Sequence, residues 1–185
     1  MSKLDPSRWA APLHMDPGPH APKIVRVFVE VPMRSRNKYE IDKASGLIAL
    51  DRHLYSSSHY PGDYGFIPGT YADDGDSLDA VVMLHDPTFS GCLIDMRPVG
   101  LFRMRDGGKE DLKILGVPNK DPLYEDVHDL DDVPKHYLRE VEHFFSTYKQ
   151  LEGVTVETNG WGARAEAEAA IVAAVRDFKG RTMLR

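Results

Sequence analysis

Apolar and polar residues alternate along the first regular stretch of the chain, residues 23–32. Val25, Val27, Val29 and Val31 share one face, and this period of two with β-branched side chains predicts a strand. Similar runs, separated by turn residues about every 8–12 positions, follow at 37–42, 46–54, 60–71, 78–84, 92–106 and 110–118. Short strands at this spacing favour a closed or sandwiched β-structure.

The pattern changes to helical spacing after residue 130, with apolar residues at Leu138, Val141, Phe145 and Tyr148. We expect Asp132 to cap this helix and Gly153 to end it. A last strand is predicted near 154–158 and a second helix over 163–180, with Gly180 as its stop. The predicted fold class is therefore α+β, mainly β: a small barrel with two flanking C-terminal helices.

The N-terminal segment differs from the rest of the chain. Residues 1–22 contain five prolines and no periodic apolar pattern, which predicts an irregular Pro-rich arm. Residues 23–185 show no internal repeat and no linker, and we expect them to form a single domain.

Composition narrows the classes of function. Hydrophobic residues make up 42% of the 185 positions, enough for a core, and the net charge of −6 argues against electrostatic binding to nucleic acid. Cys92 is the single cysteine, so an internal disulfide is excluded. The apolar runs are too short to cross a bilayer, and the N-terminus lacks the apolar core of a signal peptide. We expect a cytoplasmic protein with no membrane partner.

An acidic cluster lies in the middle of the chain, directly before a predicted buried strand. It holds Asp73, Asp74, Asp76 and Asp79 within seven positions. Taken alone, such a turn is most often a solvated loop. Asp74 and Asp76 point the same way in extended backbone, however, and Asp79 can converge on them. Rigid, convergent carboxylates favour a hard cation such as Mg²⁺, Mn²⁺ or Ca²⁺.

Two other metal sites fit the sequence poorly. In a calcium-binding EF-hand loop numbered from Asp74, Asp79 takes the place of the required glycine and His85 that of the closing glutamate. The eight histidines show no zinc-binding spacing.

Further acids and bases lie elsewhere in the chain and have ordinary explanations one by one. Lys38 and Glu40, for example, share one strand face and could be a weak ion pair. Together these residues supply carboxylates for hard metals and cations for a phosphate-bearing anion, as phosphoryl chemistry requires. They are Lys38, Glu40, Arg52, Asp106, Asp111, Lys113, Tyr148 and Lys149.

The order of these motifs resembles that of the soluble family I inorganic pyrophosphatases, in their shorter bacterial form. The family signature D-x-D-P-x-D appears as DGDSLD at 74–79, with Ser77 where proline is usual. Around it lie, in the same order, VEVP, NKYEIDK, LDR, YPGDYGFIP, RPVG, RD…EDLK, HFFSTYK and GW. The resemblance extends from about residue 23 to residue 179.

The resemblance implies a five-stranded OB-like closed barrel with additional strands, and Mg²⁺-dependent hydrolysis of pyrophosphate to two phosphates. Several Mg²⁺ ions per site are implied, with Mn²⁺ or Zn²⁺ as substitutes, and a homohexamer. Asp76 would be the general base, and Glu30 would line the pocket. Metal ligands would be Asp74, Asp79, Asp106 and Asp111, with Glu40 acting through water. The substrate would contact Lys38, Arg52, Tyr64, Lys113, Tyr148 and Lys149.

Two other functions remain open from the residues alone. An OB-like barrel also suits a single-stranded nucleic-acid binder, whose bases would stack on Tyr60, Tyr64 and Phe66, although no basic stripe accompanies them. The second alternative is a metal-buffering module, which binds metal ions and catalyses no reaction. For Ser77, we expect its hydroxyl to bond a nearby turn amide and the loss of proline to cost about 0.4–1 kcal/mol.

Overall fold

A computed structural model describes residues 11–182. The strands of this part of the chain are β1 (Val25–Val31), β2 (Asn37–Ile41), β3 (Ile48–His53), β4 (Asp63–Phe66), β5 (Asp79–Val82), β6 (Leu93–Asp106), β7 (Lys109–Pro118) and β8 (Val156–Ala163). The α-helices are α1 (Ala11–His14), α2 (Lys135–Thr147) and α3 (Arg164–Thr182). Short 3-10 helices span Pro122–Tyr124, Leu130–Asp132 and Gln150–Glu152.

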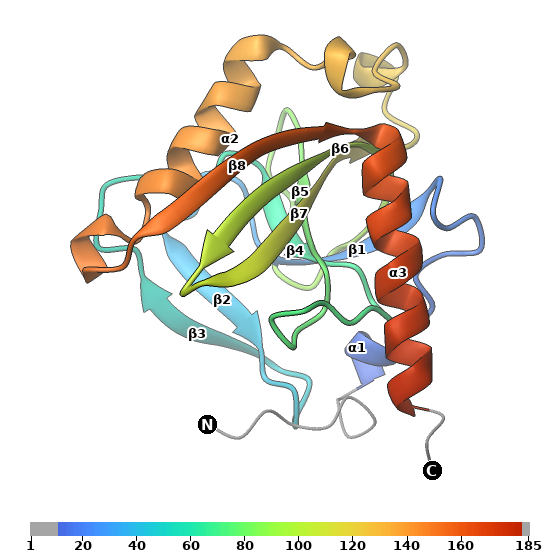
Figure 1. The fold of residues 1–185 in the computed structure, drawn as a ribbon, viewed down its shortest axis with the longest axis horizontal. Coiled ribbons are helices and arrows are strands. Elements are labelled where there is room, and N and C mark those ends of the chain that lie inside the picture. The colour runs from blue at the N-terminus through green and yellow to red at the C-terminus, as the bar shows by residue number, and fades with distance from the viewer. Residues whose placement is uncertain (1–10, 183–185) are drawn as a thin grey trace.

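Five of the strands form a closed ring. They pair in the order β1-β4-β5-β7-β6, and β6 pairs back onto β1. The β5–β7 pair is parallel, and β8 adds to the outside edge of β6 (Figure 1). The predicted fold class is confirmed in these terms: a mainly β chain with a closed five-stranded ring, additional strands and two C-terminal helices.

The valine alternation of β1 explains its place in the ring. Val25, Val27, Val29 and Val31 are all buried. Next to them, Gly65 of β4 comes so close to β1 that an added Cβ would lie 1.9 Å from the carbonyl oxygen of Phe28. Glycine is therefore required there for the two strands to pair.

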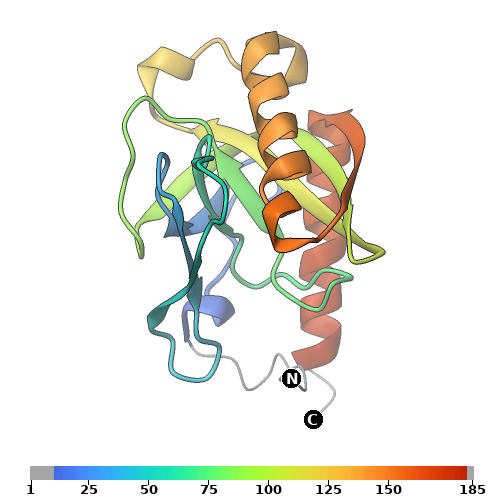
Figure 2. The same ribbon diagram turned by 90° about the vertical axis from the view of Figure 1, so that its left-hand side faces the viewer.

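The two long helices cover different parts of the ring, as the two views show (Figures 1 and 2). Phe144 and Phe145 of α2 belong to one hydrophobic cluster, which includes Phe102 of β6. Ala167 and Ile171 of α3 belong to a second cluster, which includes Val25, Val27 and Val29 of β1. The packing of the two helices on these clusters holds the strands between them in place. The ends of those strands carry the polar side chains described below.

The observed boundaries of both long helices differ from the predicted ones. Asp132 does not cap α2: it ends a 3-10 helix, and its carboxylate accepts hydrogen bonds from the backbone N–H groups of His128 and Asp129 at 2.9 Å. Pro134 takes the N-cap position of α2. The helix ends at Thr147, and Gly153, with φ 73°, instead caps the 3-10 helix that follows. Gly180 lies inside α3, which continues to Thr182.

The described part of the Pro-rich arm lies against the ring. Leu13 of α1 is only 2% exposed and packs with Ile41, Phe66 and Phe178. Its carbonyl oxygen accepts a hydrogen bond from the backbone N–H of Gly69 at 2.9 Å. Residues 1–10 of the arm lie outside the described residues, and the division into an arm and a domain stays a prediction.

Candidate active site

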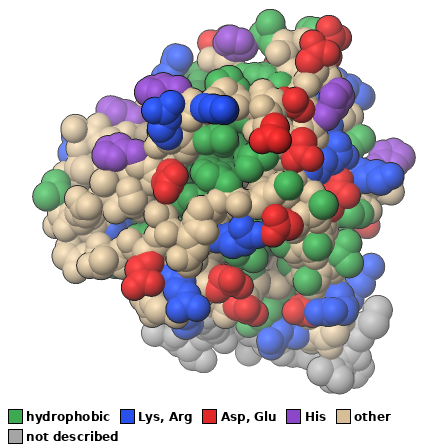
Figure 3. All heavy atoms as spheres, turned by 45° about the horizontal axis from the view of Figure 1, so that its top comes forward, with side chains coloured by type: hydrophobic (Ala, Val, Ile, Leu, Met, Phe, Trp, Pro, Cys, Tyr) green, Lys and Arg blue, Asp and Glu red, His purple; other side chains and the backbone are tan. Residues whose placement is uncertain are grey.

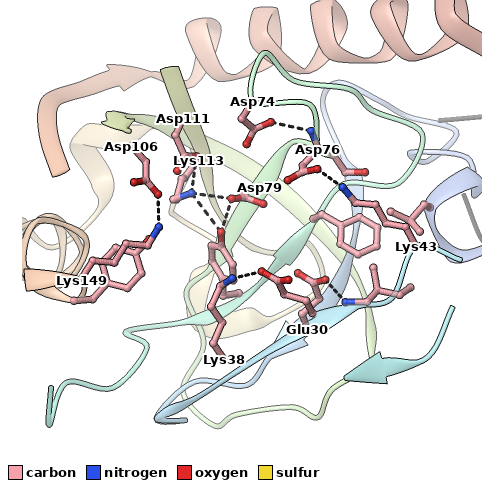
Figure 4. Close-up of a pocket in the computed structure, with 17 residues that line it drawn as sticks. Glu30, Lys38, Lys43, Asp74, Asp76, Asp79, Asp106, Asp111, Lys113 and Lys149 are labelled. Carbon is pink, nitrogen blue, oxygen red and sulfur yellow. Dashed lines mark hydrogen bonds and ion pairs between the residues drawn. The ribbon is translucent and has the colours of Figure 1, made fainter. Parts of the chain in front are cut away.

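A cavity of about 260 Å³ opens between the ring and the β2–β3 hairpin. Carboxylates and lysines make up most of its lining. The acidic residues are Glu30, Glu40, Asp74, Asp76, Asp79, Asp106 and Asp111, and the lysines are Lys38, Lys43, Lys113 and Lys149 (Figure 4). Leu13, Ile41, Tyr64, Phe66, Ser77 and Tyr148 complete the wall.

The acidic cluster forms a braced loop at one wall of the cavity. The backbone N–H of Ala72 donates to the carbonyl oxygen of Asp76 at 2.8 Å, and that of Asp76 donates to Oδ1 of Asp74 at 2.9 Å. Gly75 takes φ 94°, a conformation that suits glycine, at the tip of the turn. The loop therefore presents Asp74 and Asp76 to the same cavity.

A buried group of charges lies deeper, where β5 and β7 run in parallel. The ammonium of Lys113 lies 2.7 Å from Oδ2 of Asp79 and 2.7 Å from Oδ1 of Asp111. The hydroxyl of Tyr64 also donates to Oδ2 of Asp79. Burial alone would lower the pKa of Lys113, but the charges of Asp111 and Asp79 outweigh it and raise that pKa well above its ordinary value. Lys113 is therefore held charged between the two carboxylates.

Two more ion pairs line the cavity at its rim. Lys149, which follows α2, pairs with Asp106 at the end of β6. Lys38 of β2 pairs with Glu40 on the same strand face, as the sequence predicts for a strand pair, and also lies 3.1 Å from Asp51. Tyr148 is buried beside Lys149.

Glu30 is a buried carboxyl at the floor of the cavity. Its Oε1 accepts a hydrogen bond from the backbone N–H of Ile41 at 2.7 Å. Burial raises the pKa of Glu30 to about 8, and the nearby charge of Asp79 adds to this effect. The side chain joins β1 to the β2–β3 hairpin and is protonated at neutral pH when no cation is near.

Asp74 and Asp79 also resist ionisation. Burial, followed by the charges of neighbouring aspartates, raises the pKa of Asp74 to about 6. Burial raises the pKa of Asp79 as well, even though Lys113 opposes the shift. A site that disfavours its own negative charges in this way gains from a bound cation.

The donor chemistry fits a divalent metal, although the carboxylates do not form a ready cage. Within residues 11–182, no group of three or more His, Cys, Asp or Glu side chains is close enough together to hold a metal ion. Lysine ammonium groups lie against the carboxylates instead. The cavity nevertheless presents carboxylate oxygens, which are the ligand type that hard cations such as Mg²⁺ prefer.

The structure brings all the predicted site residues except Arg52 to the wall of this cavity. Arg52 instead bonds Asp51 at 2.6 Å and Glu152 at 3.1 Å. Its link to the site runs through Asp51, which also lies beside Lys38. The sequence analysis missed Lys43, which pairs with Asp76, and Leu13 from the arm. Lys43 ends the NKYEIDK motif, and this position could have identified it as a site residue.

The Ser77 hydroxyl does not behave as expected. We expected a hydrogen bond to a turn amide, but Oγ of Ser77 is buried without a hydrogen-bond partner among the described residues. The nearby backbone N–H of Leu78 donates to Oγ1 of Thr70 at 2.9 Å instead. Ser77 therefore places an unsatisfied polar atom within the acidic loop.

The surface does not favour a nucleic-acid binder. Acidic and basic side chains are interspersed on the face shown in Figure 3, without a continuous basic stripe. Tyr60, Tyr64 and Phe66, the three aromatics considered for stacking, are all buried. No helix among the described residues is long and apolar enough to cross a membrane.

Comparison with known proteins identifies the family of the chain. The family model for inorganic pyrophosphatase matches residues 27–179. An inorganic pyrophosphatase of Halalkalibacterium halodurans is 50% identical over 149 residues, 80% of this chain and 90% of that protein. One of Haloferax volcanii is 49% identical over 158 residues, 85% of this chain and 89% of that protein.

Solved structures agree in fold. The crystal structure of inorganic pyrophosphatase from Thermus thermophilus matches with a TM-score of 0.90 and 41% identity, over 92% of this chain and 100% of that one. The resemblance seen in the ordered motifs is confirmed, and the chain belongs to the inorganic pyrophosphatase family.

Proposed function

We propose that this chain is an inorganic diphosphatase, which hydrolyses pyrophosphate to two orthophosphates with the help of Mg²⁺. One observation carries the proposal: seven carboxylates and four lysines line a single cavity of about 260 Å³. Carboxylates provide ligands for hard cations, and lysines bind phosphoryl oxygens. A cavity that combines both suits a substrate with two phosphoryl groups and a high negative charge.

The proposed metal ligands are Asp74, Asp79, Asp106 and Asp111, with Glu40 acting through water. Bound divalent cations supply two things: they neutralise the negative charge of the substrate and lower the pKa of a bound water. The raised pKa values of Asp74 and Asp79 support this role, because a bound cation would favour the ionised form of each carboxyl. Mn²⁺ or Zn²⁺ are the proposed substitutes.

Asp76 is the proposed general base. Its side chain is 53% exposed at the wall of the cavity, so water reaches it directly. It lies between Asp74 and Asp79 in the braced loop, where an attacking water would lie close to the proposed metal ligands. Asp76 accepts a proton from this water as the water attacks phosphorus, and the second phosphate departs on the opposite side.

The proposed substrate contacts are Lys38, Lys113, Lys149, Tyr64, Tyr148 and, from the edge of the site, Arg52. Each of these lysines already lies beside a carboxylate. If the carboxylates held metal ions, these ammonium groups would be free to bind phosphoryl oxygens. A protein of net charge −6 could then bind a highly charged anion.

The test is release of phosphate from pyrophosphate by the purified chain. We expect fast release with Mg²⁺ and loss of release when a chelator removes the metal. Absence of release with Mg²⁺, together with tight binding of a single-stranded oligonucleotide, would favour the nucleic-acid alternative. If the chain binds metal ions but neither releases phosphate nor binds the oligonucleotide, the result would favour the metal-buffering module.

Assembly and location are further proposals, the first from the resemblance and the second from the composition of the chain. We propose a homohexamer in the cytoplasm. Light scattering of the purified chain would give its mass in solution, and a mass of one subunit would contradict the hexamer.

A further inference from the structure

We propose that Lys43, a residue to which the roles above give no part, is a positioning residue for Asp76. The proposal rests on the function proposed above, because it concerns the general base of that reaction. Lys43 lines the same cavity, and its ammonium forms an ion pair with Oδ1 of Asp76 (Figure 4). The two residues are 33 positions apart in the chain.

Lys43 comes from a fixed turn between β2 and β3. The carboxylate of Asp42 accepts hydrogen bonds from the backbone N–H and the hydroxyl of Ser45, at 2.7 and 2.6 Å. The backbone N–H of Gly46 donates to the carbonyl oxygen of Asp42 at 2.8 Å. These bonds give the start of the Lys43 side chain a defined position.

Asp76 comes from the other wall, in the braced loop of the acidic cluster. That loop joins the six-stranded sheet, whereas Lys43 belongs to the separate β2–β3 sheet. The pair therefore connects two independently supported segments across the cavity. A carboxylate held from outside its own loop has one preferred orientation, while an unpaired one rotates about its Cβ–Cγ bond.

The choice of oxygen matters for the reaction. The ammonium of Lys43 contacts one carboxylate oxygen of Asp76, Oδ1, which leaves the second oxygen to accept the proton of the attacking water. The charge of Lys43 does not by itself explain a strong effect, because Lys43 and Asp76 are 29% and 53% exposed and solvent weakens their attraction. Orientation of the base is the effect we propose.

This assignment differs from two simpler roles. A lysine that contacts the substrate would raise KM for pyrophosphate when it is removed. A lysine that only joins the hairpin to the ring would lower stability and leave kcat unchanged. A positioning lysine lowers kcat and leaves KM and stability nearly unchanged.

The experiment compares Lys43→Met, Lys43→Arg and the control Lys120→Met, which removes an exposed lysine outside the cavity. For Lys43→Met we expect kcat to fall about 10- to 100-fold, with KM for pyrophosphate within about threefold of the parent. Lys43→Arg keeps a cation at Oδ1 and should recover about half of the lost activity on a logarithmic scale. The control should match the parent.

A double-mutant cycle gives a sharper readout. In an Asp76→Asn background, Lys43→Met should lower kcat by less than about twofold, because Lys43 acts through Asp76. An equal loss in both backgrounds would overturn the proposal, as would a rise in KM with unchanged kcat. Unchanged kcat in Lys43→Met alone would also overturn it.

A binding measurement without substrate keeps the test separate from activity. Calorimetric titration with Mg²⁺ alone should give affinities for Lys43→Met and the parent that agree within about threefold, because solvent screens the charge of Lys43 and Asp76 is not a proposed metal ligand. Lys43→Arg should bind Mg²⁺ like the parent. Much weaker Mg²⁺ binding to Lys43→Met would show that Lys43 supports the metal site instead, and would overturn the proposal. Absence of turnover in the parent would refute the proposed function separately.

Discussion

The ammonium of Lys113 lies 2.7 Å from Oδ2 of Asp79, and the two residues are direct register partners on the parallel strands β5 and β7. Lys113 is 1% exposed, so this is a buried ion pair at the floor of the cavity. Asp111, two residues earlier on β7, accepts from the same ammonium. One lysine thus offsets the charge of two carboxylates that we propose as metal ligands.

Removing Lys113 should destabilise the metal-free protein strongly. Lys113→Met leaves Asp79 and Asp111 without a cation, and breaking a buried pair costs about 3–5 kcal/mol. We expect the free energy of unfolding, measured with urea in the presence of a chelator, to fall by about that amount.

Added Mg²⁺ should recover part of this loss, because it replaces the missing cation between the carboxylates. The exposed change Lys120→Met is the matched control and should have little effect. Equal stability of Lys113→Met and the parent in chelator would contradict the buried pair.

The metal-free protein should become less stable as the pH rises from about 5 to 8. The folded-state pKa values of Asp74 and Glu30, about 6 and about 8, lie above their ordinary values of 3.8 and 4.5. A carboxyl with a raised pKa stabilises the fold fully below its ordinary value, and this stabilisation is lost as the pH rises through the folded pKa. Urea unfolding at several pH values in chelator measures the slope.

Glu30→Gln provides the control for this slope, because the amide cannot ionise but keeps an oxygen for the backbone N–H of Ile41. The variant should lose the part of the slope above about pH 7. A parent whose stability rises between pH 5 and pH 8 would contradict the assigned shifts. Asp42 and Asp132 have lowered pKa values and affect stability only at lower pH.

Ser77 should be replaceable with a gain in stability. Its buried hydroxyl has no partner among the described residues, so Ser77→Ala removes an unsatisfied group and should stabilise by about 1 kcal/mol. Ser77→Pro restores the residue usual in the family signature and should stabilise by about 0.4–1 kcal/mol through the unfolded chain. Thermal unfolding measures both changes.

Turnover of both Ser77 variants should stay within about twofold of the parent, because Ser77 has no proposed contact with metal or substrate. A large loss of turnover in Ser77→Pro, with folding intact, would show that the acidic loop has a shape that proline does not fit.

Leu13 tests whether the arm belongs to the folded domain. Its side chain is buried against Ile41 and Phe66, so Leu13→Ala should cost about 2–3 kcal/mol in urea unfolding. Leu123→Ala is the matched control, because Leu123 is 65% exposed. If Leu13→Ala is as stable as the parent, the arm folds independently of the ring.

The sequence predicted the strands of the ring well because their cause is local. The valines of β1 alternate, and a period of two with β-branched residues has one common structural meaning. The helix ends were predicted less well. Asp132 satisfies the general rule for an N-cap, yet its carboxylate caps the preceding 3-10 turn, a competition that spacing alone does not reveal.

The cavity was predicted mainly through the ordered motifs, and the family that they indicate is confirmed. The spacing of Asp74 and Asp76 predicted that both would face one site, but a turn at Gly75, with φ 94°, brings them together, and not extended backbone. Pairs across the fold, such as Lys43 with Asp76, depend on how the hairpin docks on the ring. That docking is a tertiary property, and it also explains why Arg52 lies beside Glu152 instead of in the cavity.

The rate of phosphate release by Asp76→Asn, relative to the parent at saturating Mg²⁺ and pyrophosphate, tests the central claim most directly. The asparagine keeps the size and polarity of the side chain but cannot accept the proton of the attacking water. We predict a loss of at least about 100-fold in kcat, with the urea midpoint within experimental error of the parent. Turnover equal to that of the parent would contradict Asp76 as the general base of this cavity.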